Sequence, residues 1–283
     1  MKQSKQWIDF EKKYSFVERY SKFYWGIGIP EKKDMQIFTK FFKQSLKNQK
    51  LKKAKVLILG STPKMRDLAA KFNSDITLID VSKEIIKGMT KLIKHKKKER
   101  KIQGNWFKTP FKDNEFDIIL GDLVLGNVGA KDLNRFLKEV NRVLKPDGEW
   151  IHRIFFVPDK WKYEPIDNTL KKFEKWKDRK KALEPYLFFN TYDPKTHLVS
   201  TSKIGKWFSK YWTGKGYNYP DKKVNWCMEE LYKTFSPYEK TWHCGTKKET
   251  WKWLSKYFKV IKEEQPNDHR LAYTFPIIVC RKN

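Results

Sequence analysis

The sequence predicts an α/β fold in which a largely parallel sheet is flanked by crossover helices. Three observations predict it. Short apolar runs alternate with helical segments through residues 51–160, and a glycine or a polar residue follows these runs. The chain ends in two strand-like segments joined by the short polar loop QPNDHR. Alternating strands and helices are typical of a parallel sheet, and the short loop indicates an antiparallel final pair.

The first 50 residues predict an N-terminal helical cap. Apolar residues recur at helical spacing over residues 5–24, and the turn GIGIPEKKD separates them from a second helix at about 34–50. That second helix carries Ile37, Phe38, Phe41 and Phe42. We expect residues 1–50 to be one part of a single domain that spans residues 1–283, a length that suits one large domain with an elaborated insertion.

Residues 51–160 predict the core of this domain. Ser82 is a good N-cap for one of its helices, and the last helix is amphipathic, with Leu133, Phe136, Leu137, Val140 and Leu144 on one face. A turn is expected at Pro146-Asp147-Gly148. The expected strands lie at residues 56–59, 76–79, 101–103, 116–120 and 149–157, and the expected helices at 64–72, 84–98 and 131–144.

The alternation breaks down after a further predicted helix at residues 165–183. Residues 184–246 are aromatic and turn-rich, and we expect them to form an insertion that covers a site. Residues 247–283 return to regular structure. They predict a helix at 251–257 and strands at 258–263 and 271–280 that complete the sheet.

The formal net charge of +29 is the most unusual feature of the composition. A basic surface attracts polyanions, so the charge is compatible with a nucleic-acid partner. Only nine of the 62 basic residues are Arg, however, and Arg is the residue suited to bidentate phosphate contacts. The densest run is KLIKHKKKERK at residues 91–101. It could bind nucleic acid, but it is also typical of a solvent-exposed helix C-terminus, where cations interact well with the helix dipole.

The sequence carries few signals for compartment or metal. No apolar run is long enough for a transmembrane helix, and the N-terminus has no apolar signal core, so we expect a cytoplasmic protein without a membrane partner. The three cysteines are far apart, which indicates neither a disulfide framework nor a thiolate zinc site. His243 and Cys244 lack further ligands at a suitable spacing, and we expect no metal. Nothing indicates the oligomeric state.

Polar residues follow the predicted strands where parallel sheets bind ligands, beyond their carboxyl ends. Asp80 follows the second strand, 20 residues after Gly60, and this spacing suits a carboxylate that accepts hydrogen bonds from ribose hydroxyls. Asn105 and Trp106, after the third strand, offer a polar edge and a flat face for a purine. The remaining strand ends are followed by Gly60-Ser61-Thr62, by Asp122, and by His152-Arg153.

These residues predict a nucleoside cofactor without a pyrophosphate. A dinucleotide would need the GxGxxG loop, whose backbone amides approach two phosphates, and that loop is missing. S-adenosylmethionine has no phosphate, and its amino-acid end needs only a tight turn and a few hydrogen bonds. The stretch VLILGSTPK at residues 56–64 is therefore predicted to be an altered cofactor loop.

Four motifs resemble those of class I S-adenosylmethionine-dependent methyltransferases. VLILG resembles the first motif, ITLIDVS the acidic second one, and GNWFKTPFKDNEFDIILGD the adenine loop followed by the fourth motif. FLKEVNRVLKPDGEWI, the most specific, resembles the helix, turn and fifth strand around the family's R-V-L-K-P-G-G sequence. The resemblance implies a Rossmann-like, doubly wound, seven-stranded sheet that is mostly parallel with an antiparallel final strand. It also implies methyltransferase activity with S-adenosyl-L-methionine as cofactor.

The resemblance assigns roles to single residues. Asp80 would hold the ribose and Asp122 would lie near the methionine amino group and the acceptor, with Val81 and Leu123 beside them in the cofactor site. The other predicted contacts are the methionine end for Gly60, Ser61 and Thr62, and the adenine for Asn105 and Trp106.

The first motif departs from the usual family pattern. Ile58 stands where an acidic residue is usual, and Thr62 and Pro63 replace later glycines. A subgroup of the family has a similar LGxTP loop followed by R-D-L, which this sequence matches at Arg66. The resemblance implies that Arg66 helps to hold the loop or the cofactor carboxylate.

Structural alternatives remain open for these residues. Asp80 could cap the following helix, Trp106 could belong to the core, and Asp122 could be a turn residue in GDLVLGN. Asp122 and His152 are the catalytic candidates, although a histidine within a strand is more often a structural residue. His243 is a weaker candidate.

The acceptor is expected to be a small molecule enclosed by the N-terminal helices and the insertion. The sequence GDLVLG after the fourth strand does not match the N-P-P-Y type of base-amine methyltransferases. Two alternatives remain: an RNA or protein methyltransferase that uses the lysine-rich surface, and a non-catalytic module on the same fold. Aromatic side chains that could form walls of the site lie at residues 20–26 and at Trp207, Tyr211, Trp212, Tyr217 and Tyr219.

Overall fold

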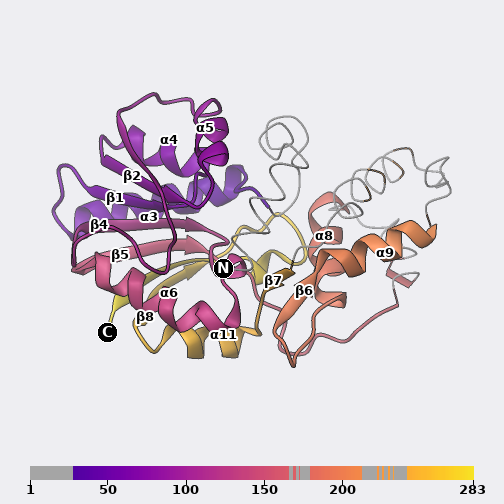
Figure 1. The fold of residues 1–283 in the computed structure, drawn as a ribbon. Coiled ribbons are helices and arrows are strands. Elements are labelled where there is room, and N and C mark those ends of the chain that lie inside the picture. Colours follow the sequence, from indigo (N-terminus) through magenta and orange to yellow (C-terminus); the bar gives the residue numbers. More distant parts are fainter. Residues whose placement is uncertain are drawn as a thin grey trace.

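A computed structural model describes residues 28–165, 179–211 and 241–283, together with residues 168, 169, 172, 222, 225, 229 and 232. Its central sheet has seven strands: β1 (Lys55–Leu59), β2 (Asp75–Asp80), β3 (Glu99–Gln103), β4 (Phe116–Asp122), β5 (Leu144–Arg153), β8 (Phe258–Glu264) and β9 (Ile277–Lys282). They are arranged in the order β3-β2-β1-β4-β5-β9-β8 (Figure 1). Only β9 runs antiparallel to its neighbours, and the predicted fold class is confirmed.

Helices cover both faces of this sheet (Figure 1). On one face, α3 (Lys32–Asn48), α4 (Pro63–Lys71) and α5 (Lys83–Thr90) pack on apolar side chains of the inner strands. On the other face lie α6 (Ala130–Val143) and α11 (Lys247–Leu254). Inner strands such as β1 are apolar on both faces because both faces are covered.

The predicted insertion contains more regular structure than the sequence indicates. It forms α8 (Arg179–Asn190), β6 (Leu198–Ser200), α9 (Thr201–Tyr211) and β7 (Thr241–His243). Strands β6 and β7 make a separate two-stranded sheet. A third apolar cluster joins these elements, with Leu183, Leu187, Val199 and Ile204 in its centre. Pro185 lies inside α8, which is why the pattern there did not predict a helix.

Several predicted boundaries are wrong. The strand expected at 149–157 is β5, which spans Leu144–Arg153, so the turn expected at Pro146-Asp147-Gly148 lies within it. Three other differences have identifiable reasons. The helix expected at 84–98 ends at Thr90, because the Asp67 carboxylate accepts the backbone N–H groups of Lys94 and His95, both at 2.8 Å, and ties that segment to α4. The strand expected from residue 271 begins at Ile277, after the 3₁₀ turn η2 (Ala272–Thr274). Helix α11 begins four residues early because Thr246 and Glu249 form a capping box.

Some predictions fall on residues outside the described ranges. The helix expected at 5–24 lies outside them entirely, and of the helix expected at 165–183 only the last residues, within α8, are described as a continuous segment. The second N-terminal helix is α3, close to its predicted place. Among the described residues, no helix combines the length and hydropathy needed to cross a bilayer.

Candidate active site

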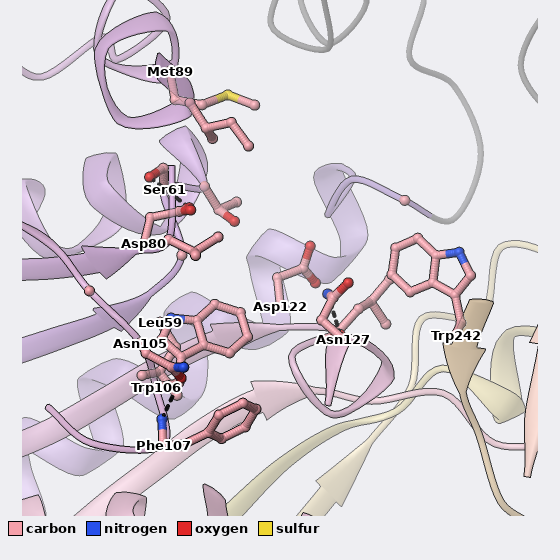
Figure 2. A pocket seen from close by; sticks show the side chains of 17 residues that line it. Leu59, Ser61, Asp80, Met89, Asn105, Trp106, Phe107, Asp122, Asn127 and Trp242 are labelled. Atoms are coloured by element: carbon pink, nitrogen blue, oxygen red, sulfur yellow. Dashed lines mark hydrogen bonds between the residues drawn. The ribbon is translucent and has the colours of Figure 1, made fainter. Parts of the chain in front are cut away.

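The candidate site lies at the carboxyl edge of the parallel strands. In the register of the sheet, Leu59 of β1 lies opposite Ile79 of β2 and Gly121 of β4. The residues that follow, Gly60, Asp80 and Asp122, therefore lie at one level. They line a single cavity together with side chains from α5, η1 (Leu125–Asn127) and β7 (Figure 2).

Gly60 makes the turn that opens the first loop. Its φ of +95° is in the region that favours glycine, and its N–H donates to the carbonyl of Ile79 at 2.9 Å. The chain then enters α4 directly, with Thr62 at the N-cap and Pro63 at the first helical position, where proline is well suited. The loop therefore needs only one glycine, which accounts for its altered sequence.

Asp80 is a buried carboxylate that forms no ion pair with any residue the structure describes. It is 8% exposed, accepting hydrogen bonds from the Ser61 hydroxyl at 3.0 Å and the Ser82 N–H at 3.1 Å. Burial raises the pKa of Asp80 to about 6, because the hydrogen bonds from Ser82 and Ser61 offset only part of the lost hydration. Asp80 therefore binds the backbone at the start of α5, as the structural alternative expected. It also lines the cavity, where a ligand can reach it.

Trp106 forms part of the cavity wall and is fixed from behind. Its indole N–H donates to the carbonyl of Ile79 at 2.9 Å, and its ring packs on Phe136 with centroids 6.1 Å apart. Asn105 is held by an Asx-type turn in which its Oδ1 accepts the Phe107 N–H at 2.9 Å. Met89 lies across the cavity from Trp106 in Figure 2, so apolar groups face each other there.

Asp122 is held in a buried ion pair with Arg153. The guanidinium Nε lies 2.7 Å from Oδ1, Nη2 lies 3.2 Å from Oδ2, and Nη1 lies 3.4 Å from Asp34 of α3. Burial raises the pKa of Asp122 and Arg153 counteracts that effect. Because the guanidinium binds both carboxylate oxygens, Asp122 is better suited to fixing charge at the edge of the cavity than to accepting a proton.

The cavity contains no Lys or Arg among its described lining residues, although the chain has a large positive net charge. A phosphate group would find no cation there. A neutral ribose has hydroxyls that suit the Asp80 carboxylate, and a sulfonium cation suits a cavity that two carboxylates border. The residues present thus fit S-adenosylmethionine better than a nucleotide phosphate.

Most predicted cofactor residues are brought together in this cavity. These are Gly60, Ser61, Thr62, Asp80, Val81, Asn105, Trp106, Asp122 and Leu123. Sequence reasoning missed Gly28, Leu59, Ile85, Met89, Gly104, Phe107, Asn127 and Trp242, which also line it. Leu59, Gly104 and Phe107 adjoin predicted positions and could have been inferred. Trp242 comes from the insertion, and no local signal in the sequence placed it here.

Arg66 does not line the cavity, which corrects its predicted role at the cofactor carboxylate. It is fully buried on the other side of α4. Its Nε donates to Glu99 Oε1 at 2.8 Å and its Nη2 to the Thr90 hydroxyl at 2.9 Å. Each position of a helix points to one side only. Position 66 of α4 points toward β3 and the end of α5, and so away from the cavity. Arg66 therefore ties three elements together.

His152 is also corrected as a catalytic candidate. It is 0% exposed and stacks on Trp150 with ring centroids 3.7 Å apart, inside the sheet rather than at the cavity. Burial lowers the pKa of His152 to about 3, so the ring is neutral. Strand side chains alternate between faces, and residue 152 shares the covered face with residue 150.

Other candidate residues lie elsewhere. Trp207 packs against the apolar cluster of the insertion, and His243 does not line this cavity. The predicted aromatic walls at residues 20–26, Trp212, Tyr217 and Tyr219, as well as the Tyr211 side chain, lie outside what the structure describes. Within the described residues there is no group of three or more His, Cys, Asp or Glu arranged to hold a metal ion.

Comparison with protein families gives one match. Residues 59–151 match the family described as "Methyltransferase domain". This segment runs from the end of β1 into β5 and includes most of the cavity's lining residues. The search of curated proteins returned no significant match.

Solved structures share the fold across nearly the whole chain. Magnesium protoporphyrin IX methyltransferase from Synechocystis PCC 6803, with bound S-adenosylhomocysteine, aligns with a TM-score of 0.56 at 10% identity, covering 99% of this chain and 100% of that one. A Burkholderia thailandensis 1,6-didemethyltoxoflavin N1-methyltransferase aligns at 0.54 and 11% identity, over 97% and 86%. A Pyrococcus horikoshii OT3 protein aligns at 0.55 and 16%, over 94% and 99%. Because the sequence identities are only 10–16%, these alignments show a shared fold and nothing about the substrate.

The new position of Arg66 leads to a test. Replacing Arg66 with Met leaves the buried Glu99 carboxylate with only the more distant Lys101 ammonium, 3.6 Å away, and we expect a loss of about 3–5 kcal/mol in the free energy of unfolding, measured by urea denaturation. Cofactor affinity should change by less than about threefold, or about 0.65 kcal/mol, because Arg66 does not line the cavity and no cofactor contact is lost. The double change Arg66→Met with Glu99→Leu should regain much of the stability, since it leaves no unpaired charge. A large loss of cofactor affinity in the stable double variant would contradict the structural role.

Proposed function

We propose that this chain, whose residues 59–151 match the methyltransferase-domain family, is a class I S-adenosylmethionine-dependent methyltransferase that transfers a methyl group to a small-molecule acceptor. The observation that carries the proposal is the single cavity at the strand ends. It brings Gly60, Asp80, Trp106 and Asp122 together from four separate segments of the sequence. Its carboxylates and its lack of described lining cations suit a phosphate-free nucleoside with a positive charge.

Each part of the cavity has a task in holding the cofactor. The Asp80 carboxylate would accept hydrogen bonds from the ribose hydroxyls, and Trp106 and Met89 would contact the two sides of the adenine region. The loop from Gly60 to Thr62 leaves room for the methionine end, near the charge that Asp122 supplies. When bound, S-adenosylmethionine supplies an activated methyl group, which is lost from sulfur as a bond to the acceptor forms.

The acceptor would enter on the side where Asn127 and Trp242 line the cavity (Figure 2). Neither residue belongs to the strand ends that would hold the cofactor: Asn127 lies in η1 and Trp242 in β7 of the insertion. The two methyltransferases named above act on a porphyrin and a toxoflavin precursor, which is support for a small-molecule acceptor here. Because Asp122 is ion-paired, the chain's main contribution would be to align the acceptor with the methyl group and exclude water.

Calorimetric titration of S-adenosylmethionine and S-adenosylhomocysteine into the full chain tests the cofactor site. We expect micromolar binding that Asp80→Ala weakens by about tenfold or more, or about 1.4 kcal/mol, because the ribose hydroxyls lose their acceptor. The matched control is Asp75→Ala, at the opposite, exposed end of β2, which should leave the affinity unchanged. Absence of binding at millimolar cofactor would favour a non-catalytic module instead.

The raised pKa of Asp80 predicts a pH dependence of cofactor affinity. Ribose hydroxyls stabilise the ionised carboxylate, so binding lowers its pKa and releases a proton where the free protein is protonated. Affinity should therefore be constant above pH 7 and fall by up to about tenfold for each pH unit below about 6. Titration of S-adenosylhomocysteine from pH 8 to pH 5 measures this. Asp80→Asn should bind weakly and with a flatter profile; equal profiles in both proteins would contradict the assignment.

The alternative acceptor is RNA or a protein bound by the lysine-rich surface. The observation that favours it is the basic segment at residues 91–98, which directly follows α5 and its cavity-lining residue Met89. Salt dependence distinguishes the two. With a neutral small acceptor, kcat/KM should change by less than about twofold between 50 and 200 mM salt. With a polyanion it should fall by about 10³ or more, as phosphate contacts are lost.

A further inference from the structure

We propose that a second cavity, between α6, α11 and β7, binds a small oxyanion, a carboxylate or a phosphate. This cavity has a volume of about 170 Å³ and is separate from the candidate active site. It is lined by Ala130, Leu133, Asn134, Leu137, His197, His243, Trp253 and Lys256. One water molecule needs about 10–15 Å³ of such space, so the cavity admits a small anion together with several waters.

His243 is the strongest sign of a ligand in this cavity. Its side chain is nearly inaccessible, with 3% of the residue exposed, and the structure gives it no hydrogen bond to any described residue. Buried polar groups are nearly always hydrogen-bonded, because an unpaired one costs free energy. The His243 ring lines the cavity and has no hydrogen-bond partner among the described residues, so it is available to a ligand there through the part of the ring that the cavity reaches.

The His243 ring is held rigidly in this position. It stacks on Trp253, with centroids 4.8 Å apart and planes at 27°. Trp253 in turn lies across Gly245, where a Cβ atom would come within 2.4 Å of the indole. The arrangement requires glycine at position 245, so the backbone is adapted to keep this aromatic pair together. The pair forms one wall, and Leu133 and Leu137 of α6 form an apolar one.

The polar lining favours an anion over a cation. The ionisable residues that line the cavity are all bases, His197, His243 and Lys256, and no described lining residue is acidic. Asn134 uses its Oδ1 to accept the Tyr257 hydroxyl at 3.2 Å, which leaves its amide N–H groups as donors. His197 has Nδ1 3.1 Å from the Tyr192 hydroxyl and 3.8 Å from a Glu249 carboxylate oxygen, so these contacts involve Nδ1 and not the second ring nitrogen, Nε2.

The two histidines are placed to act on one ligand. Their ring centroids are 6.2 Å apart with planes at 83°, and both rings contact Trp253. A small oxyanion accepts several hydrogen bonds at once, and charge-assisted bonds of this kind are the strong ones. Two imidazoles, an amide and an ammonium group match that need.

Histidine NMR in the full chain tests the proposal. The ring resonances of His197 and His243 are followed in ¹H–¹³C spectra during titration with sodium phosphate and, separately, with sodium acetate, while sodium chloride keeps the ionic strength constant. We expect saturable shifts of both rings with at least one of the two anions. The anion that saturates identifies the head group. The buried His152 ring should not move, and His95, in the basic segment after α5, reports general anion accumulation on the positive surface.

Two variants separate a built site from general charge attraction. Lys256→Ala should weaken the binding by about tenfold or more, as expected for the loss of a hydrogen bond to a charged group. The matched control, Lys252→Ala, removes the same charge from α11 at a position that does not line the cavity, and it should leave binding unchanged. His243→Phe, which keeps the ring stack, should abolish the His197 shift. Linear shifts that His95 shares, or equal weakening by both lysine variants, would overturn the proposal.

Discussion

The ion pair between Asp122 and Arg153 connects the central sheet to the candidate site. The two residues are register partners at the ends of β4 and β5, so the parallel pairing itself places them side by side. Both are buried, and removing one partner from such a pair costs about 3–5 kcal/mol. Arg153 also contacts Asp34, whose carboxylate accepts the Glu31 N–H at 2.7 Å in the capping box of α3. One guanidinium thus sets the charge at the cavity and anchors the helix that precedes β1.

The same register explains why residues far apart in the sequence meet. Parallel strands end at one edge, and β1, β2 and β4 are aligned so that the residue after each strand's last paired position lies at one level. Gly60 closes the turn there, Asp80 faces the cavity, and Asp122 is neutralised from behind. The lysines are elsewhere among the described residues. The cavity is therefore bordered by two carboxylates and by no described lining Lys or Arg, in a protein with a large positive net charge.

The sequence predicts the core well because its signals are local. The strands are short apolar runs, the amphipathic helix at 130–143 has one clear face, and parallel topology then determines which ends meet. Arg66 and His152 were misplaced for a different reason: their segments were predicted, but the side of the helix or strand they occupy depends on packing. Trp242 and His243 could not be predicted at all, since β7 has three residues and pairs only with β6.

Strand β7 belongs to the insertion, but its side chains line both cavities of the domain. Successive strand residues point to opposite faces, and here Trp242 lines the candidate active site while His243 lines the second cavity. The segment is held at both sides: the Cys244 N–H donates to the backbone carbonyl of His197 at 2.8 Å, and the Val157 N–H donates to the backbone carbonyl of Gly245 at 2.9 Å. A Cβ on Gly126 would come within 3.2 Å of the Trp242 ring, so η1 is fitted closely against this strand. One short, tightly packed backbone segment therefore supplies a side chain to each of the two cavities.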